Sequence, residues 1–409
     1  MADNNRDINT IINLKFLNYI MKKLAILAVA LFSFVAASAR PICGAERVNV
    51  WKPILKDKKV CVLTNYSALV GKNYERHLID VMIEEGINIV AIATPEHGLS
   101  GKADAGAKVS SSSYEKNGVS IPVWSLYGKN RKMSVEQAKQ FDVLVFDIQD
   151  VGVRFFTYYV TMLYTFDALA QEGKKLVVMD RPNPNGMYVD GPILDMKRAS
   201  FVGALPIPVV HGLTMGELAN MAAGEGWYPK IDIEVVKCKN YTHQTRYQLP
   251  IKPGPNVRTM QAVYLYPSSC LIEGTVFSEA RGTEFGFEAY GHPDIAPTGF
   301  SYIPRSIEGA TNPKHLDKVC HGVDLRNIPK EQVIKEGFTL KYVIDAYNRF
   351  GGGDEFFGKK KYHFMRLVGA DYVYDMIMAG KSADEIKAVW QKDLEAYKEL
   401  RRKYLLYKE

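Results

Sequence analysis

The chain has 409 residues, of which 47% are hydrophobic and 24% are charged, and its formal net charge is +7. These proportions are typical of folded globular proteins, so they exclude a disordered, fibrous or collagen-like chain. Domains usually hold about 100–200 residues, so the length predicts two domains and allows three. The positive excess is small for this length and does not indicate a nucleic-acid partner.

The first forty residues have the pattern of a secretory signal. Lys22 and Lys23 form a short basic region, a nearly continuous apolar run follows, and a small-x-small cleavage site ends at Ala39. This arrangement is typical of a signal peptide that begins at Met21, and a buried N-terminal helix is the alternative. The apolar run is shorter than the about 20 residues that span a bilayer. We therefore expect a periplasmic or secreted protein with no stable membrane insertion once the signal is removed.

Six short apolar runs are predicted to be buried strands, with amphipathic stretches between them. The runs cover residues 60–64, 89–94, 121–126, 143–148, 176–179 and 207–210. The amphipathic stretches cover residues 76–85, 134–140 and 157–171. Strands that alternate with helices indicate a parallel sheet with both faces covered, which also explains why the runs lack polar alternation. The fold class predicted for this half is therefore α/β with a mostly parallel sheet.

Polar side chains follow the end of every predicted strand. They are Asn65, Glu96, His97, Tyr127, Gln149, Asp150, Arg154, Asp180, Arg181, Asn183 and His211. Ligands of parallel sheets bind beyond the carboxyl ends of the strands, so these residues predict a polar site at that edge. Helix caps and turns would explain Asn and Asp, but they explain His, Gln, Glu and Arg less well. The chain has neither a P-loop nor a G-x-G-x-x-G fingerprint after the first strand, so no nucleotide is expected.

The second half is less regular and begins with a helix. Thr214-x-x-Glu217 is a capping box, which favours a capping role for Glu217 over a catalytic one. Residues 250–300 are rich in Gly, Pro and aromatic side chains, as expected for a surface built from loops. Residues 273–284 of this segment hold three carboxylates and an arginine, namely Glu273, Glu279, Arg281 and Glu284. This cluster is either a self-paired, solvated group of charges or part of the site.

Ser382 caps a last helix whose apolar positions recur at intervals of three and four residues. Its core-facing stripe comprises Ile386, Val389, Trp390, Leu394 and Tyr397. Residues 398–403 are its expected solvated end, with cations suited to a helix C-terminus. The five cysteines are widely spaced and form no zinc motif, which predicts isolated and mostly buried thiols, with a disulfide as the alternative.

A set of short motifs occurs in a specific order. They are residues 94–98 (TPEHG), 122–128 (PVWSLYG), 147–158 (DIQDVGVRFFTY), 180–184 (DRPNP), 211–219 (HGLTMGELA), 273–275 (EGT), 278–283 (SEARGT) and 401–407 (RRKYLLY). Together they closely resemble the exo-β-N-acetylmuramidase family of the NamZ type, from about residue 47 to residue 407. Members of that family often have glycine where this chain has Ala280.

The resemblance implies an exo-acting glycosidase that releases N-acetylmuramic acid (MurNAc) from the non-reducing end of peptidoglycan-derived MurNAc-GlcNAc fragments. It implies a Rossmann-like catalytic domain and a smaller C-terminal domain that closes the cleft. With the leader expected over residues 1–39, we place the first domain at 40–212 and the second, of α+β class, at 213–409. It also implies that Glu96, in the Pro-Glu-His-Gly motif, is the catalytic residue.

Glycoside cleavage usually needs two carboxylates, one that protonates the leaving oxygen and one that acts as nucleophile or activates water. Glu96 at a strand end suits the acid role. Candidates for the second carboxylate are Asp150, Glu273, Glu279 and Glu284. Glu279 and Glu284 are the preferred pair, because their segment is expected to face the sheet edge from the second domain. The acetamido oxygen of the substrate is the alternative nucleophile.

The substrate also carries a lactyl carboxylate, which a planar guanidinium can bind with two hydrogen bonds. Arg154, Arg181 and Arg281 are the candidate anchors, and an internal ion pair is the alternative role of each. Tyr127, Tyr158 and Tyr290 could stack on sugar rings, although the pattern favours a core role for each. The predicted substrate-binding set is Asn65, His97, Gln149, Asp150, Arg154, Tyr158, Asp180, Arg181, Asn183, His211, Asn256, Glu273 and Arg281.

Two other functional classes stay open at this point. One is a periplasmic sugar- or muropeptide-binding protein without catalysis. The other is a metal-dependent hydrolase that would use Glu96, His97, Asp150, Asp180 and His211. The usual metal-ligand spacings, such as H-x-H and H-E-x-x-H, do not occur in the chain, so no metal or cofactor is expected.

Overall fold

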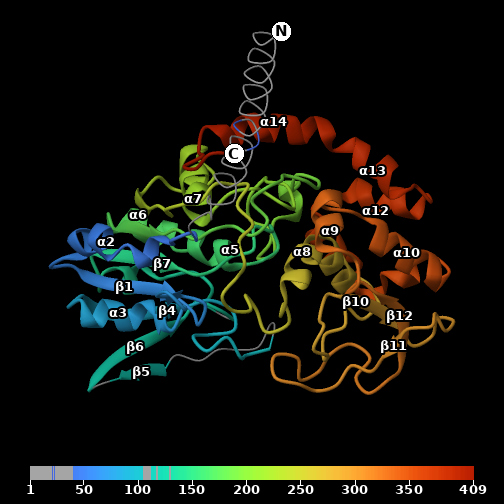
Figure 1. The fold of residues 1–409 in the computed structure, drawn as a ribbon, viewed down its shortest axis with the longest axis horizontal. Coiled ribbons are helices and arrows are strands. Elements are labelled where there is room, and N and C mark those ends of the chain that lie inside the picture. Colours follow the sequence, from blue (N-terminus) through green and yellow to red (C-terminus); the bar gives the residue numbers. More distant parts are fainter. Residues whose placement is uncertain (1–20, 22, 24–39, 105–111, 117, 129) are drawn as a thin grey trace, which may run out of the picture. The chain divides into compact units, whose positions relative to one another are not determined.

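A seven-stranded sheet forms the N-terminal half of the protein, in the order β5-β6-β4-β1-β7-β8-β9 (Figure 1). The strands are β1 (Lys59–Thr64), β4 (Asn88–Thr94), β5 (Ser112–Lys116), β6 (Val119–Ser125), β7 (Val143–Asp147), β8 (Lys175–Met179) and β9 (Asp232–Val236). Adjacent strands in the series β6-β4-β1-β7-β8-β9 are parallel, whereas the edge strand β5 is antiparallel to β6. This confirms the predicted α/β class with a mostly parallel sheet.

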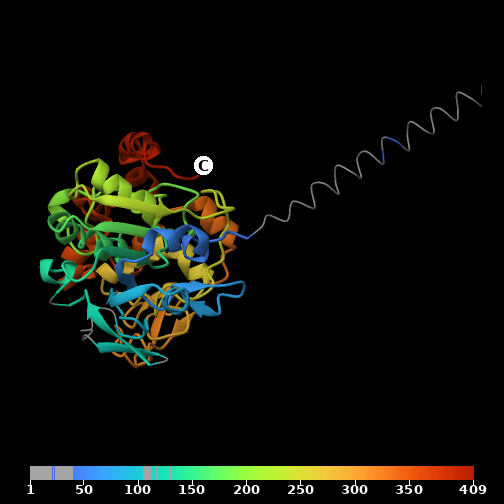
Figure 2. The same cartoon turned by 90° about the vertical axis from the view of Figure 1, so that its left-hand side faces the viewer.

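The computed structural model describes residues 21, 23, 40–104, 112–116, 118–128 and 130–409. The predicted signal peptide therefore lies outside the described residues, apart from Met21 and Lys23. Residues 41–409 form one compact unit, which Figure 2 shows from the side. Within the described part of the chain, no helix is both long enough and apolar enough to cross a membrane.

The two faces of the sheet enter separate cores, because successive residues of a strand point to opposite sides. Val60 and Val62 of β1 lie in one core, which is covered by α2 (Val48–Leu55) and α3 (Leu78–Glu84). Cys61 and Leu63 lie in a larger core on the other face. That core is covered by α4 (Val135–Ala138), α5 (Tyr158–Leu163), α6 (Phe166–Gln171) and α7 (Met215–Gly224). The short strands β2 (Leu69–Val70) and β3 (Arg76–His77) form a separate hairpin. Both faces are therefore covered, as predicted.

The prediction of a strand at residues 207–210 is wrong. This segment forms only isolated bridges, in which Val210 pairs with Val153 and with Asp190. Pro206 and Pro208 flank its first residue and cannot donate backbone hydrogen bonds, so the segment cannot join the sheet as an inner strand. The strand that follows β8 in the sheet is instead β9.

The predicted helix over residues 157–171 is two short helices, α5 and α6, separated at Tyr164 and Thr165. The capping boxes at Ser134 and Thr214 are both present, so Glu217 is confirmed as a capping residue. Glu217 also contacts His243 and the backbone N–H of Leu406, so it ties the start of α7 to the C-terminal tail.

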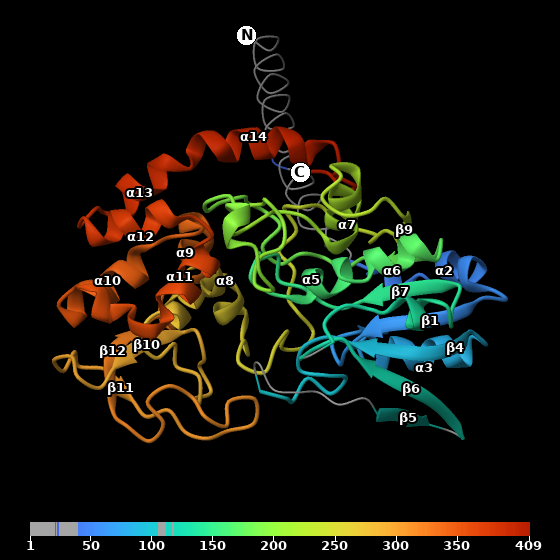
Figure 3. The same cartoon turned by 180° about the vertical axis from the view of Figure 1, so that it is seen from behind.

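The C-terminal half combines a three-stranded antiparallel sheet with helices, as the smaller α+β part was predicted to do. Its sheet order is β10 (Ala289–His292), β12 (Cys320–Asp324) and β11 (Ser301–Tyr302). Its helical elements are α8 (Met260–Ser269), η3 (Cys270–Gly274), α9 (Lys330–Glu336), α10 (Lys341–Phe350), η5 (Gly358–Lys360), α11 (Lys361–Val368) and α12 (Asp371–Met378). Figure 3 shows these elements beside the large sheet.

The last predicted helix is divided at Trp390 into α13 (Ala383–Val389) and α14 (Gln391–Arg402). The predicted stripe is buried except for Val389, which is 48% exposed. The expectation of a fully solvated end is also wrong, because Arg401 is buried and donates two hydrogen bonds to the carbonyl oxygen of Gly212. The helix therefore fastens the tail to the N-terminal half (Figure 1). All five cysteines are free and buried, which confirms isolated thiols.

Candidate active site

A cavity of about 730 Å³ lies beyond the carboxyl ends of β4, β6 and β7. The N-terminal half contributes Glu96, His97, Asp104, Tyr127, Arg131, Phe155–Tyr158 and Ser200–Val202 to its lining. The C-terminal half contributes Tyr266, Glu273, Glu279, Arg281, Gly309, Ala310, Asn312–Lys314, Lys360, His363 and Arg366. Ligand cavities in proteins usually measure about 300–1,000 Å³, so this one has room for a small oligosaccharide.

Glu96 is held between two hydroxyl groups at the cavity. The hydroxyl of Tyr127 donates to Oε1 over 2.7 Å, and the hydroxyl of Thr157 donates to Oε2 over 3.0 Å. The three residues follow β4, β6 and β7, which are neighbours or near neighbours in the sheet. The two hydrogen bonds fix the plane of the carboxyl group, which is the kind of preorganisation a reacting side chain needs.

The turn after β4 presents Glu96 to the cavity. His97 and Gly98 both adopt left-handed backbone conformations, with φ values of 69° and 68°, and the N–H of Gly98 donates to the carbonyl of Pro95. His97 lines the cavity, and its Nδ1 lies 2.6 Å from the carbonyl oxygen of Ala103. Burial lowers the pKa of His97, so the imidazole is neutral at pH 7.

One part of the C-terminal wall of the cavity pairs two carboxylates with two cations. Arg281 donates to Glu273, and its Nε lies 3.1 Å from Oε1 of Glu279. Nζ of Lys314 lies 3.0 Å from Oε2 of Glu279. Burial alone would raise the pKa of Glu273, but the adjacent Arg281 guanidinium outweighs it and holds this pKa well below its usual range. The predicted charge cluster is therefore self-paired and also lines the cavity.

Ala280 lies between two of these cavity residues in a conformation that favours glycine. Its φ is 61°, in the left-handed region where a Cβ atom is unfavourable. The glycine that the resemblance leads us to expect here thus has a conformational reason. Alanine retains the bend, and both Glu279 and Arg281 still reach the cavity.

Glu284 does not belong to this wall. Its side chain is 81% exposed and pairs with Arg258, and it is not among the cavity-lining residues. Of the two preferred candidates for the second carboxylate, the structure therefore brings Glu279 to the cavity of Glu96 and leaves Glu284 outside.

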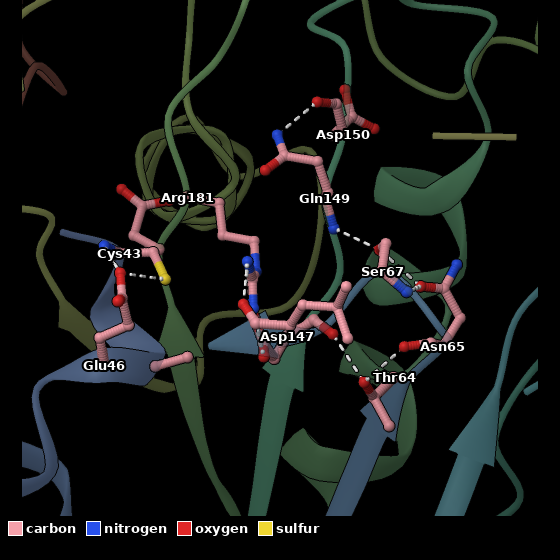
Figure 4. Close-up of polar contacts among 12 residues, drawn as sticks. Cys43, Glu46, Thr64, Asn65, Ser67, Asp147, Gln149, Asp150 and Arg181 are labelled. Atoms are coloured by element: carbon pink, nitrogen blue, oxygen red, sulfur yellow. Dashed lines mark hydrogen bonds and ion pairs between the residues drawn. The ribbon is translucent and has the colours of Figure 1, made fainter. Parts of the chain in front are cut away.

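Asn65, Gln149 and Asp150 are buried at the predicted edge and do not line the cavity; Figure 4 shows their polar contacts. The side-chain oxygen of Asn65 accepts from the N–H and the hydroxyl of Ser67, and the Ser67 hydroxyl accepts from the N–H of Gln149. Oδ1 of Asp150 accepts from the N–H of Gly152 over 2.6 Å, while its Oδ2 has no hydrogen-bond partner among the described residues. Burial raises the pKa of Asp150 to about 7.

Arg181 and Arg154 are also internal. Arg181 binds Asp147 through Nε and Nη2, at 2.5 and 2.9 Å, and both side chains are buried (Figure 4). Arg154 is fully buried and has no carboxylate partner in the described part of the chain. It donates instead to the carbonyl groups of Pro192, Ile207, Leu367 and Val368. Neither arginine lines the cavity.

Asp180, Asn183 and His211 connect segments of the chain to one another. Asp180 accepts hydrogen bonds from the start of α7 and from Tyr407, and burial raises its pKa to about 6. The amide of Asn183 donates to the carbonyl of Leu213, whose N–H donates to Nδ1 of His211. Burial lowers the pKa of His211 to about 3. These three residues are buried outside the cavity lining.

The last three candidate residues of the sequence analysis lie at different distances from the cavity. Asn256 is buried and donates to the carbonyl of Gly309, so it supports a loop that lines the cavity. Tyr158 lines the cavity directly, and its hydroxyl donates to the carbonyl of Pro253. Tyr290 is a core residue whose hydroxyl donates to Asp345.

The sequence interpretation missed several cavity residues. They are Arg131, Phe155, Phe156, Thr157, Phe201, Tyr266, Lys314, Lys360, His363 and Arg366. Phe155–Thr157 lie within a quoted motif and could have been found there, whereas Lys314 and the three basic residues of 360–366 carry no local signal. Within the described ranges, no three His, Cys, Asp or Glu side chains gather closely enough to hold a metal ion.

A mostly parallel sheet whose strand ends carry a cavity with several carboxylates and aromatic rings has the composition of a glycoside hydrolase site. The comparison with known families agrees with this class. The models described as exo-beta-N-acetylmuramidase NamZ, N-terminal and C-terminal, match residues 60–261 and 264–407. The chain therefore belongs to the NamZ family of exo-β-N-acetylmuramidases, a family of glycoside hydrolases.

Individual relatives cover nearly the whole chain. The peptidoglycan beta-N-acetylmuramidase NamZ of Bacillus subtilis is 37% identical over 378 residues, which are 87% of this chain and 89% of the relative. A crystal structure of a DUF1343 family protein from Bacteroides fragilis is 49% identical, with a TM-score of 0.82 over 91% of this chain and 100% of that one. A second DUF1343 structure from the same organism is 25% identical, with a TM-score of 0.76 over 90% and 99%.

Proposed function

We propose that this protein is an exo-acting β-N-acetylmuramidase that releases MurNAc from the non-reducing end of peptidoglycan-derived MurNAc-GlcNAc fragments. The observation that carries the proposal is Glu96, held by Tyr127 and Thr157 in a cavity that also presents Glu279. Family membership supports the reaction class, and the cavity supplies the residues for it.

Glu96 is the group that transfers a proton to the leaving oxygen in this proposal. A general acid must lie within hydrogen-bond reach of that oxygen and keep a fixed orientation, which its two hydroxyl partners provide. Glu279 is the second carboxylate, either as nucleophile or base or as the group that positions the substrate's own acetamido oxygen. Arg281 and Lys314 pair with Glu279 at 3.1 and 3.0 Å and hold its side chain at the cavity.

The test is release of MurNAc from a chromogenic MurNAc-GlcNAc substrate by matched Glu→Gln variants. We expect Glu96→Gln to lower kcat by about a thousandfold with the fold intact, the size of effect usual for a lost general acid. Glu279→Gln should also lose most activity. Glu284→Gln is the control, because this side chain is exposed and paired outside the cavity.

The possible outcomes separate the three classes that the sequence left open. Near-wild-type turnover by Glu96→Gln would show that Glu96 is not the acid. Tight binding of MurNAc-GlcNAc by the wild type without any turnover would indicate a sugar-binding protein. Activity abolished by EDTA and restored by a divalent metal would indicate a metal-dependent hydrolase. NMR detection of the first anomer released decides between retention and inversion.

The proposed place of action is the periplasm or the exterior of the cell. The basic, apolar and small-residue pattern from Met21 to Ala39 supports export. Expression of the full chain in a bacterium, fractionation and N-terminal sequencing should give a mature protein that begins at Arg40. An unprocessed chain in the cytoplasm would contradict export without affecting the proposed reaction.

A further inference from the structure

The proposed substrate is an anion, and the three arginines expected to bind its carboxylate are already occupied. Both Nη atoms of Arg154 donate to backbone carbonyls, and Arg181 pairs with Asp147, both outside the cavity. Arg281 does line the cavity, but Glu273 and Glu279 both pair with it. A guanidinium between two carboxylates has little attraction left for a third, so the substrate anion needs another cation.

The cavity contains two such cations on one short stretch of chain. Lys360 ends η5 and Arg366 lies in the last turn-and-a-half of α11, and both line the cavity. Within the described residues, no carboxylate lies within ion-pair distance of either side chain. Six helical residues rise about 9 Å along the helix axis, so the backbone positions of the two cations are separated by about the length of one sugar unit with its substituent. His363 lies between them and faces Glu273 over 3.7 Å.

Helix α11, which begins directly after Lys360 and carries Arg366, is firmly held. A Cβ atom on Gly274 of η3 would lie 2.4 Å from Cα of Phe364, so only glycine permits the close packing of η3 on α11. At the end of α11, Arg154 donates to the carbonyls of Leu367 and Val368. The two exposed cations thus project from a rigid element, and rigid elements hold binding groups more accurately than loops do.

We propose that Lys360 and Arg366, called the basic pair below, form the subsite that binds the carboxylate borne by the O3 substituent of the muramic acid ring. The carboxylate is that of the lactyl group itself or, where the lactyl group is amidated, that of the attached peptide stem. The proposal rests on the proposed function and adds to it the residues that distinguish MurNAc from GlcNAc.

Arg131 is the competing cation, on a different segment of the cavity lining. Its guanidinium lies over the ring of Phe201 at 4.5 Å and near the ring of Tyr127 at 5.5 Å. These aromatic faces engage the cation and keep it in place. We therefore assign the anion to the basic pair, and the variants below test this choice directly.

The experiment measures kcat and KM for three substrates that differ only at O3. They are MurNAc-GlcNAc with a free lactyl group, its uncharged lactyl amide, and a lactyl dipeptide with a free terminal carboxylate. The enzymes are the wild type, Lys360→Gln, Arg366→Gln, the double variant and Arg131→Gln. Lys359→Gln is the matched control, since Lys359 is an exposed neighbour that does not line the cavity.

We expect each single change in the basic pair to raise KM for the free lactyl substrate about tenfold, with kcat changed far less, because a charge-assisted hydrogen bond contributes about this factor. The double variant should lower the preference for the free lactyl group over its amide about a hundredfold. If the pair binds the stem instead, the loss appears with the dipeptide substrate and not with the free lactyl one. Lys359→Gln should keep the wild-type preference.

Three results would overturn the assignment. One is an equal loss on the charged substrates and the amide, which would mean a general defect. The second is a double variant that keeps the wild-type preference for both charged substrates over the amide. The third is loss of the preference in Arg131→Gln alone, which would place the anion on the other segment.

Failure of the proposed function is recognised separately, as absence of turnover of all three substrates by the wild type. Calorimetric binding of MurNAc and GlcNAc then tests the subsite by itself. Preferential binding of MurNAc that the double variant loses would support the basic pair, and equal binding of both sugars by the wild type would overturn it.

Discussion

The hydroxyl group of Tyr127 donates a 2.7 Å hydrogen bond to the Glu96 carboxylate, and the sheet register explains why the two side chains meet. Thr94 of β4 pairs with Ser125 of β6 in parallel. Glu96 and Tyr127 each lie two residues beyond that pair, so the parallel strands bring them to the same height at the sheet edge. The contact therefore depends on strand pairing rather than on proximity in the chain.

Tyr127→Phe should lower kcat by about fivefold, because it removes one of the two hydrogen bonds that orient Glu96 and a hydrogen bond contributes about 1 kcal/mol. The ring and its contact with Phe201 are retained, so the melting temperature should stay within about 2 °C of the wild type. Tyr114→Phe is the matched control, since that hydroxyl donates to Asp80 away from the cavity. Full kcat in Tyr127→Phe would mean that this bond does not position Glu96.

Arg154→Lys should reduce the free energy of unfolding by about 3 kcal/mol. Lysine keeps the charge but lacks the planar fork, so at least two of the four backbone carbonyls lose their donor inside the protein. Denaturant unfolding measures the change. Arg246→Lys is the control, because its pair with Glu331 is exposed and contributes at most about 1 kcal/mol. Equal stability of the two variants would show that the carbonyl contacts of Arg154 contribute little.

Asp150 should make the folded protein less stable as the pH rises from about 4 to about 7. Its pKa is raised by burial from 3.8 to about 7, so in this window the unfolded chain ionises while the folded protein keeps the proton. Above about pH 7 the folded state carries the full penalty, of the order of 4 kcal/mol.

Asp150→Asn removes this titration and keeps an oxygen for the N–H of Gly152. The stability of the variant relative to the wild type should therefore rise by about 3 kcal/mol between pH 5 and pH 8, measured by denaturant unfolding. Asp167→Asn changes an exposed carboxyl paired with Lys132 and should show no such trend. Parallel pH profiles for Asp150→Asn and the wild type would contradict a raised pKa.

Local sequence patterns determined much of this protein by themselves. Buried strands are recognisable because they are short apolar runs, and Glu96 because it follows one of them at the carboxyl edge. The capping boxes at Ser134 and Thr214 were equally predictable, since a cap depends on residues three positions apart. The strand expected at residues 207–210 failed because two prolines override an apolar pattern.

Only the tertiary structure decided which polar residues at the edge reach the cavity. Arg181 forms an ion pair with Asp147 inside the protein. Lys360 and Arg366, from a segment far along the chain, line the cavity. The local sequence does not distinguish a cation that is paired inside the protein from one that lines the cavity. Its role depends on the charge it meets after folding, and long-range packing brings that charge into place.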